Sequence, residues 1–231
     1  MNTRYQSSQD MVYETLRTCI LNFRFVPGTI MSTQEMATRL SVSRTPVREA
    51  FIRLQRDGLV QILPHRETMV SLIDMERVRQ ERFLRMQLET AVIRLFSQNS
   101  NQDHLLQLHS LIEMQLQASI EGNYENFHKY DNHFHRIFFD GAKQPLVWEL
   151  INQSSTHYQR FRLLSLQYQN IPGNIIQQHQ EILCALEKGQ LDTLLKIHQE
   201  HLSKLDIEEE LLRQKNPEFF LTDSVPVNPF L

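Results

Sequence analysis

Four side chains in the second half of the chain are of the types that bind a divalent metal ion. Asp131 and His135 are four residues apart, so on a helix both lie on one face. His179 lies ten residues before Gly189 and His201 twelve residues after it, so an antiparallel hairpin turning there would bring both to about the same level. One carboxylate and three imidazoles could then converge between helices, a set that suits Zn²⁺, Ni²⁺, Mn²⁺ or Fe²⁺. The alternative for each histidine is a hydrogen-bonded, partly buried side chain.

Helical position indicates which other nearby side chains could belong to this set. His133 lies about 160° from His135 around a helix, so we do not expect it to be a ligand. His198 is one turn before the last predicted ligand and is a possible substitute for it. Arg160 and Arg162 could also reach inward from their helix.

Arg85 is a cation on a face expected to be buried. It shares a helical stripe with Val92 and Phe96, and a buried guanidinium needs an anion. That anion could be Glu81 or Glu89, each four residues away. It could instead be the carboxylate of a bound effector.

A second group of candidate residues lies in a short helix near the N-terminus and could contact DNA. Ser43 can cap this helix, and an apolar stripe runs along it from Val47 to Leu54. Arg44, Thr45 and Arg48 lie well away from the stripe, at about 100° per residue. An arginine fork can bond a guanine edge or grip a phosphate, and a helix N-terminus adds backbone donors. The alternative is a solvated polar face.

The elements that would position these DNA-contacting residues form a winged helix-turn-helix. A Pro27-Gly28 break ends the first helix, Asp57-Gly58 ends the third, and the turn between the second and third lies at Ser41-Val42. Two short strands follow as a hairpin, or wing. The predicted elements are helices over about 11–23, 32–40 and 43–56, and strands over 59–63 and 69–72.

From Asp74 onward the sequence predicts only helices. Helix-period segments alternate with breaks at 99–101, 121–123, 141–142, 171–173 and 187–189, which is typical of an antiparallel bundle of about six helices. The predicted fold class is therefore mainly α. The predicted domains are a winged helix-turn-helix domain over 8–73, an all-helical ligand-binding and dimerisation domain over 74–215, and an irregular tail over 216–231.

Composition and charge fit this division. The chain has 231 residues, of which 41% are hydrophobic and 22% charged, as in ordinary globular proteins. Residues 1–73 carry nine arginines, no lysine and six acidic residues, whereas the remainder has 15 basic and 21 acidic residues, so the two parts differ in sign. No apolar run approaches the roughly 20 residues that span a bilayer, and the first residues lack a signal peptide's apolar core. We expect a cytoplasmic protein with no membrane partner.

Residues 27–64, PGTIMSTQEMATRLSVSRTPVREAFIRLQRDGLVQILP, resemble the DNA-binding domain of the GntR family of bacterial transcription regulators. VSRTPVREA is the most specific part of the match. Two positions depart from the family pattern: Gln34 stands where a charged residue is usual, and Glu67 stands where the wing usually has glycine. A carboxylate near the wing tip would repel phosphate. The resemblance implies DNA contacts by Ser43, Arg44, Thr45 and Arg48, and by His65 and Arg66 in the wing.

Residues 74 to about 210 resemble the all-helical FCD effector domain of the FadR-like branch of that family. The matching segments are DNHFH, QHQEILCALEKGQ and HQEHL. Metal-binding members use one aspartate and three histidines, and the resemblance implies that Asp131, His135, His179 and His201 hold one divalent metal ion per chain. It also implies that Arg85 lines a pocket for a small organic or sugar acid. Gln178 replaces a common glutamate.

The predicted function is therefore a ligand-responsive, DNA-binding repressor. We expect a homodimer on an inverted-repeat operator, with a small carboxylate as effector. One alternative is a metallohydrolase, since a metal with an open position activates water, but motifs such as HExxH or GxSxG are absent and an enzyme would not explain the helix-turn-helix. Another is a scaffold with structural histidines. We expect no enzymatic activity.

Overall fold

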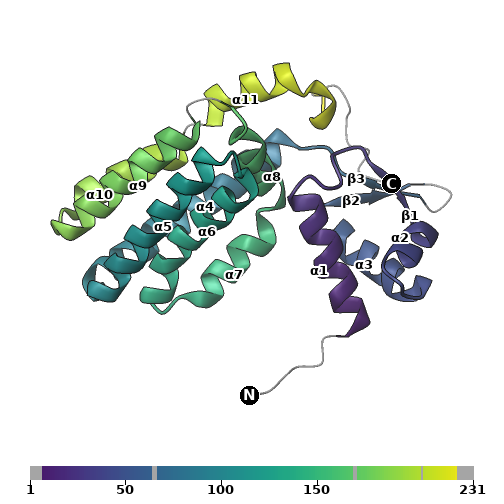
Figure 1. Cartoon of the computed structure of the whole chain (residues 1–231), viewed down its shortest axis with the longest axis horizontal. Coiled ribbons are helices and arrows are strands. Elements are labelled where there is room, and N and C mark those ends of the chain that lie inside the picture. Colours follow the sequence, from purple (N-terminus) through teal and green to yellow (C-terminus); the bar gives the residue numbers. More distant parts are fainter. Residues whose placement is uncertain (1–6, 64–66, 169–170, 204, 223–231) are drawn as a thin grey trace. The chain divides into compact units, whose positions relative to one another are not determined.

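The computed structural model of the chain describes residues 7–63, 67–168, 171–203 and 205–222 (Figure 1). The chain divides into two compact units, one formed by residues 1–76 with 213–231 and the other by residues 77–212. The mainly α fold class expected from the sequence is confirmed, with a small sheet confined to the first unit. Among the described residues, no helix combines the length and the apolar character needed to cross a membrane.

The first unit contains the predicted three helices and wing strands, and one further strand. β1 and β2 both pair antiparallel with β3, with Ile30 opposite Met69 and Val60 opposite Val70. The sequence did not predict β1, because its last residue, Ser32, is also the N-cap of α2 and the segment has no separate strand pattern. The elements are α1 (Ser8–Leu21), β1 (Ile30–Ser32), α2 (Thr33–Arg39), α3 (Arg44–Arg56), β2 (Val60–Ile62) and β3 (Glu67–Val70).

The core of this unit fixes how α3 is presented. Val47 and Phe51 of α3 are buried in one cluster with Leu16 of α1. The Oγ of Ser32 accepts a hydrogen bond from the backbone N–H of Glu35 at 3.1 Å, the cap that the sequence predicts for α2. Because one side of α3 is held in the core, its opposite side is left free for a ligand.

The end of the chain returns to the first unit. After the 3₁₀ helix η2 (Pro217–Phe219), the backbone N–H of Ile73 donates to Phe219 O at 2.7 Å, and the N–H of Leu221 donates to Ile73 O at 3.0 Å. Phe220, which forms a parallel bridge with Ile73, is 2% exposed. The described part of the segment that we expect to be an irregular tail is therefore ordered against this unit.

The second unit is helical throughout its described part. It has eight helices where the sequence predicts about six, because the break at Ser155 and the one at Ser203 contain neither glycine nor proline. Pro172 does not end a helix but lies in the first turn of one, where its missing N–H costs nothing. The helices are α4 (Met75–Asn99), α5 (Gln102–Ile120), α6 (Tyr124–Gly141), α7 (Pro145–Ser154), α8 (Thr156–Ser165), α9 (Ile171–Glu187), α10 (Leu191–Leu202) and α11 (Leu205–Lys215).

Side-chain contacts in the second unit join α4, α9 and α10 each to α6, so these four helices surround one interior. α5 packs against α6 and α9, and α9 packs against α10 across the turn at Gly189, whose φ of 64° suits glycine. At the end of α6, a Cβ on Gly141 would lie 2.5 Å from a ring carbon of Phe96, so the absence of a side chain allows close approach to α4. The predicted hairpin turning at Gly189 is therefore present.

Candidate functional site

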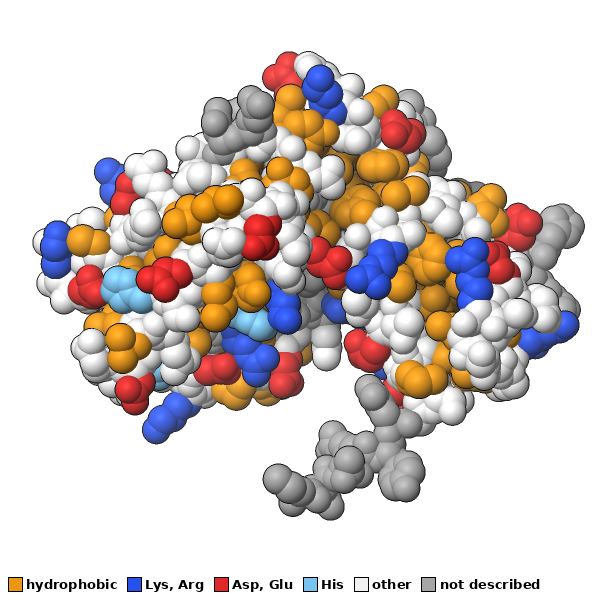
Figure 2. All heavy atoms as spheres, in the orientation of Figure 1, with side chains coloured by type: hydrophobic (Ala, Val, Ile, Leu, Met, Phe, Trp, Pro, Cys, Tyr) orange, Lys and Arg blue, Asp and Glu red, His pale blue; other side chains and the backbone are white. Residues whose placement is uncertain are grey.

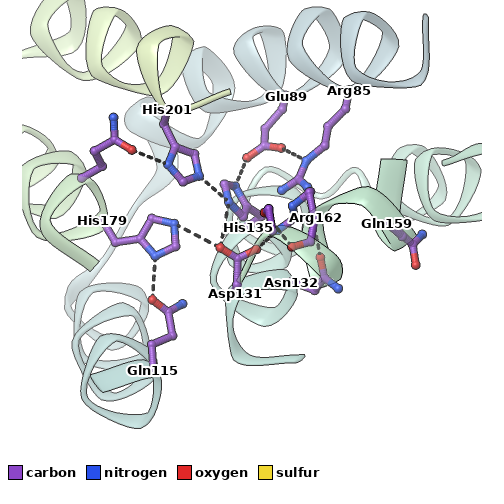
Figure 3. Close-up of polar contacts among 12 residues, drawn as sticks. Arg85, Glu89, Gln115, Asp131, Asn132, His135, Gln159, Arg162, His179 and His201 are labelled. Carbon is purple, nitrogen blue, oxygen red and sulfur yellow. Dashed lines mark hydrogen bonds and ion pairs between the residues drawn. The ribbon is translucent and has the colours of Figure 1, made fainter. Parts of the chain in front are cut away.

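The four side chains predicted to bind a metal ion meet inside the second unit (Figure 3). α6 supplies Asp131 and His135 from one face, α9 supplies His179 and α10 supplies His201. One ligand atom from each lies within 4.8 Å of those of the other three. The first three side chains are buried and His201 is partly buried. We call these residues the ligand cluster.

Each histidine of the ligand cluster donates a hydrogen bond from Nδ1 to a residue outside the cluster. The acceptor for His179 is Gln115 Oε1 on α5, at 2.8 Å, and that for His201 is Gln178 Oε1, at 3.1 Å. His135 Nδ1 is bonded to a carboxylate oxygen of Glu89 on α4. An amide or carboxylate oxygen only accepts, so the proton of each imidazole is on Nδ1 and the lone pair is on Nε2.

The three Nε2 atoms face one another and the carboxylate of Asp131. His201 Nε2 is 3.3 Å from His135 Nε2, while Asp131 Oδ1 is 3.6 Å from His179 Nε2 and 4.0 Å from His135 Nε2. Lone pairs that point at each other repel unless a cation lies between them. Ligands that bind one Zn²⁺ at about 2.0–2.2 Å lie roughly 3–3.5 Å apart, close to these separations. The donor set therefore fits a divalent metal ion.

The environment keeps the ligand histidines neutral, as metal ligands must be. Burial lowers the pKa of His179 and His201 well below 6.5, and lowers that of His135 to about 4 despite the nearby Glu89 carboxylate. Burial works to raise the pKa of Glu89, but the positive charge and hydrogen bonds around it outweigh burial and hold its pKa well below 4.5. Each imidazole can therefore bind a metal without first losing a proton at neutral pH.

Arg85 takes one of the two partners considered for it. Its Nε donates to Glu89 Oε2 at 3.0 Å, and the two side chains are 3% and 0% exposed. The Nη2 of Arg85 has no hydrogen-bond partner among the described residues. Glu81 instead accepts from the backbone N–H of Tyr158 at 2.8 Å. Glu89 thus joins Arg85 to His135.

Two further histidines, His133 and His198, lie on the helices that carry the ligand cluster. His133 is exposed on α6 and is outside the ligand cluster, as predicted from its angle. His198 is fully buried, with Nε2 3.2 Å from Glu89 Oε1, and with His135 and Glu89 forms a second group of possible ligand atoms. It faces Glu89 rather than Asp131.

A small cavity adjoins the ligand cluster. Its volume is about 60 Å³, enough for roughly four water-sized positions. Asp131, His201 and Arg162 line it together with apolar side chains such as Leu202, and Glu208 adds a carboxylate. Arg85 is not among the residues that line it. Sequence reasoning named Glu89 as a possible partner of Arg85 but missed its bond to His135, and it missed Gln115 as the partner of His179.

In the first unit, the predicted DNA-contacting residues of α3 are all exposed: Ser43, Arg44, Thr45 and Arg48. Ser43 occupies the N-cap position and is exposed, and its side chain makes no capping hydrogen bond. Figure 2 shows basic side chains interspersed with acidic ones on the visible face of this unit. These features are what contact with a phosphate backbone requires.

The wing is described only in part. His65 and Arg66, both predicted to contact DNA, lie outside the described residues. Glu67, the first residue of β3, is exposed. The predicted wing contacts of these two residues therefore remain predictions, and the carboxylate of Glu67 lies next to the wing tip.

Comparison with known proteins identifies both units. Residues 8–70 match the bacterial regulatory proteins of the gntR family, and residues 82–204 match the FCD domain. The chain is 32% identical over 215 residues to the HTH-type transcriptional repressor RspR of Escherichia coli K12, covering 93% of this chain and 94% of RspR. It is 29% identical over 225 residues to an HTH-type transcriptional regulator of Streptomyces ambofaciens, covering 97% and 94%.

Solved structures share the fold. Escherichia coli McbR/YncC superposes with a TM-score of 0.72 at 23% identity, covering 90% of this chain and 98% of the other. A GntR regulator from Rhodococcus sp. RHA1 superposes with a TM-score of 0.74 at 22% identity, covering 88% and 97%.

Proposed function

Since this chain belongs to the GntR family of bacterial transcription regulators and carries an FCD domain, we propose that it is a repressor whose DNA binding responds to a small organic acid. The family consists of regulators and not enzymes, so the metallohydrolase alternative is not pursued. The name of RspR as a repressor favours repression as the direction of control. The site of action would be DNA in the cytoplasm.

DNA recognition is assigned to the exposed face of α3. Arg44 and Arg48 can bond guanine edges or phosphates from the first turns of the helix, and Ser43 and Thr45 can add hydroxyl contacts. One such helix reads only a few base pairs, so a two-fold dimer on an inverted repeat would double the contact. His65 and Arg66 would add wing contacts.

The DNA assignment is tested on a site selected from random duplex DNA by the purified protein. Arg44→Ala and Arg48→Ala should each weaken binding of that site by about 1–3 kcal/mol at fixed salt, because each removes a bidentate donor. Arg136→Ala is the control: Arg136 is an exposed arginine of α6, paired with Asp140, and its loss changes the net charge equally. If both α3 variants bind like the control, the assignment of α3 is wrong.

One divalent metal ion per chain is assigned to Asp131, His135, His179 and His201. The observation that carries this proposal is the set of three Nδ1 hydrogen bonds, which turn three neutral Nε2 lone pairs toward one carboxylate oxygen. When bound, the ion would supply a Lewis-acid anchor for an oxygen of the effector. The donor set does not choose among zinc, nickel, manganese and iron.

Elemental analysis of protein prepared without a histidine tag tests the metal proposal. Wild type should carry about one divalent ion per chain, and His135→Ala and His179→Ala should carry much less. His133→Ala removes an exposed histidine from the same helix as His135 and should retain the ion. Equal metal content in all four proteins would exclude the site.

The proposed effector is a small carboxylate held in the cavity beside the ligand cluster. The sequence assigned its second anchor to Arg85, which does not line this cavity and whose Nη2 atom has no hydrogen-bond partner among the described residues. An effector can shift DNA binding only if it binds the competent and incompetent arrangements with different affinity. Thermal-shift screening of mono- and dicarboxylates and sugar acids, with and without metal, should find a ligand whose stabilisation depends on the metal.

A further inference from the structure

The exposed side of α3 carries one apolar side chain among its polar ones. Among the exposed residues of this helix, all of which the structure describes, Ile52 is the one apolar residue. It is 39% exposed, whereas its neighbours Phe51 and Leu54 lie in the core at 2% and 0%. Helix propensity does not favour isoleucine at such a position, since arginine and glutamine form helices more readily. A single exposed isoleucine is common on protein surfaces, so its role must be judged from its place on the helix.

Ile52 lies on the side of α3 that carries the predicted DNA contacts. At about 100° per residue, it is about 40° around the helix from Arg48 and about 20° from Thr45. The three residues are spaced i, i+3 and i+7, so their side chains form one row. Val47 and Leu54 lie on the opposite side of α3 and are 0% exposed. A duplex that contacts Arg48 therefore also faces Ile52.

The distance along α3 separates Ile52 from the arginine contacts. A rise of about 1.5 Å per residue places Ile52 about 6 Å beyond Arg48. Successive base pairs are about 3.4 Å apart, so a helix lying along the major groove would bring Ile52 about two base-pair steps from the contact of Arg48. Ile52 would thus meet a base pair of its own.

The chemistry of the major groove limits what an isoleucine can recognise there. Its side chain neither donates nor accepts hydrogen bonds, and the apolar group that a base edge presents in this groove is the C5-methyl group of thymine. Contact between the two removes apolar surface of both from water. At a cytosine or a purine, the isoleucine would instead cover a polar edge and leave its donors or acceptors without partners.

We propose that Ile52 reads one thymine in each half-site of the operator, by packing against the C5-methyl group of that base in the major groove. The proposal rests on the assignment of α3 to DNA made above, and it adds the identity of one base to that assignment. Ile52 carries no charge, so its contribution is a preference for thymine rather than attraction to the phosphate backbone.

The test replaces thymine by deoxyuridine, which lacks only the C5-methyl group, in the site selected from random duplex DNA. Each thymine position is changed in both half-sites in turn, and binding by the full chain is measured at fixed salt. For wild type, one position should weaken binding by about fourfold per half-site, the factor expected when one buried carbon group is lost. Ile52→Ala should bind the selected site more weakly, and the same deoxyuridine should then have little further effect, because the methyl group has already lost its partner.

Two further variants accompany Ile52→Ala. Met11→Ala removes a side chain of α1 that is 46% exposed in the same unit, and it should distinguish thymine from deoxyuridine as wild type does. Ile52→Gln keeps the side-chain length and favours the helix, so it replaces Ile52→Ala if the latter does not fold. It should lose the preference for thymine in the same way.

The arginine variants separate failure of this proposal from failure of the DNA assignment. If Arg44→Ala and Arg48→Ala bind the selected site like the Arg136→Ala control, the assignment of α3 is wrong and this proposal is wrong with it. If they bind weakly but no thymine position responds to loss of its methyl group, the thymine proposal alone is overturned. It is also overturned if the sensitive position stays equally sensitive in Ile52→Ala or Ile52→Gln.

Discussion

Glu89 links the buried Arg85 to His135 of the ligand cluster, and Glu89→Gln is the most informative single substitution in this site. The side chain is 0% exposed and accepts hydrogen bonds from both His135 Nδ1 and Arg85 Nε. Glutamine has nearly the same shape but no charge. The substitution therefore leaves the Arg85 guanidinium, 3% exposed, without its anion.

The expected cost follows from this unpaired charge. Removing one partner of a buried ion pair typically destabilises by about 3–5 kcal/mol, a large share of the roughly 5–15 kcal/mol that holds a domain folded. Loss of the carboxylate behind a ligating imidazole should also weaken metal binding by about 10- to 100-fold. Arg85→Gln with Glu89→Gln should recover much of the stability, since no charge is then stranded, but should not restore the metal affinity.

The assay uses a reporter inside the second unit. Trp148, the single tryptophan of the chain, is 5% exposed on α7, so its fluorescence follows urea unfolding of this unit. Glu113→Gln, an exposed glutamate on α5, is the matched control and should be within about 0.5 kcal/mol of wild type. The reasoning would be refuted if Glu89→Gln were as stable as this control. It would also be refuted if the double variant lost as much stability as the two single variants, Glu89→Gln and Arg85→Gln, lose together.

Three further predictions concern packing, pH and the chain end. Gly141→Ala should destabilise the second unit by about 1–3 kcal/mol in the Trp148 assay, because the new Cβ would clash with Phe96, whereas Gly173→Ala meets nothing within 4 Å and should be neutral or stabilising. Metal-free protein should lose stability as pH falls from about 6.5 toward 4, because the pKa values of His135, His179 and His201 are depressed in the folded state, so the unfolded chain binds more protons. Burial raises the pKa of Glu81 to about 7, and this group acts in the opposite sense. Urea titrations at several pH values measure the balance, and a flat stability profile would show that the histidines do not dominate. Phe220→Ala should cost the first unit about 3–5 kcal/mol and speed hydrogen exchange at the Ile73 amide, and unchanged exchange there would contradict its role in that core.

The sequence predicted the ligand cluster because its geometry is mostly local. Asp131 and His135 share a face by helical spacing alone, and one turn at Gly189 sets His179 against His201. Arg162 and Gln115 could not be ranked in this way, since their roles depend on how α8 and α5 pack against other helices.

The structural elements that the sequence did not predict are those with the weakest local sequence pattern. β1 runs directly into the N-cap of α2 at Ser32, and the break at Ser155 has no glycine or proline to mark it. Arg85 was correctly placed on a buried face, but periodicity does not say whether Glu89 or a ligand balances it. Partner choice among buried charges is decided by tertiary packing.

The return of the chain end to Ile73 makes the helical unit an insertion within the DNA-binding unit. Residues 77–212 are connected to the first unit by two covalent links, one within the first turn of α4 and one within the last turn of α11. A domain tethered at both ends has fewer ways to rotate as a free body than one on a single linker. A rearrangement around the ligand cluster could therefore act on the first unit through both covalent links. A fragment ending at Glu76 would lack part of its own core, because Phe220 would be absent.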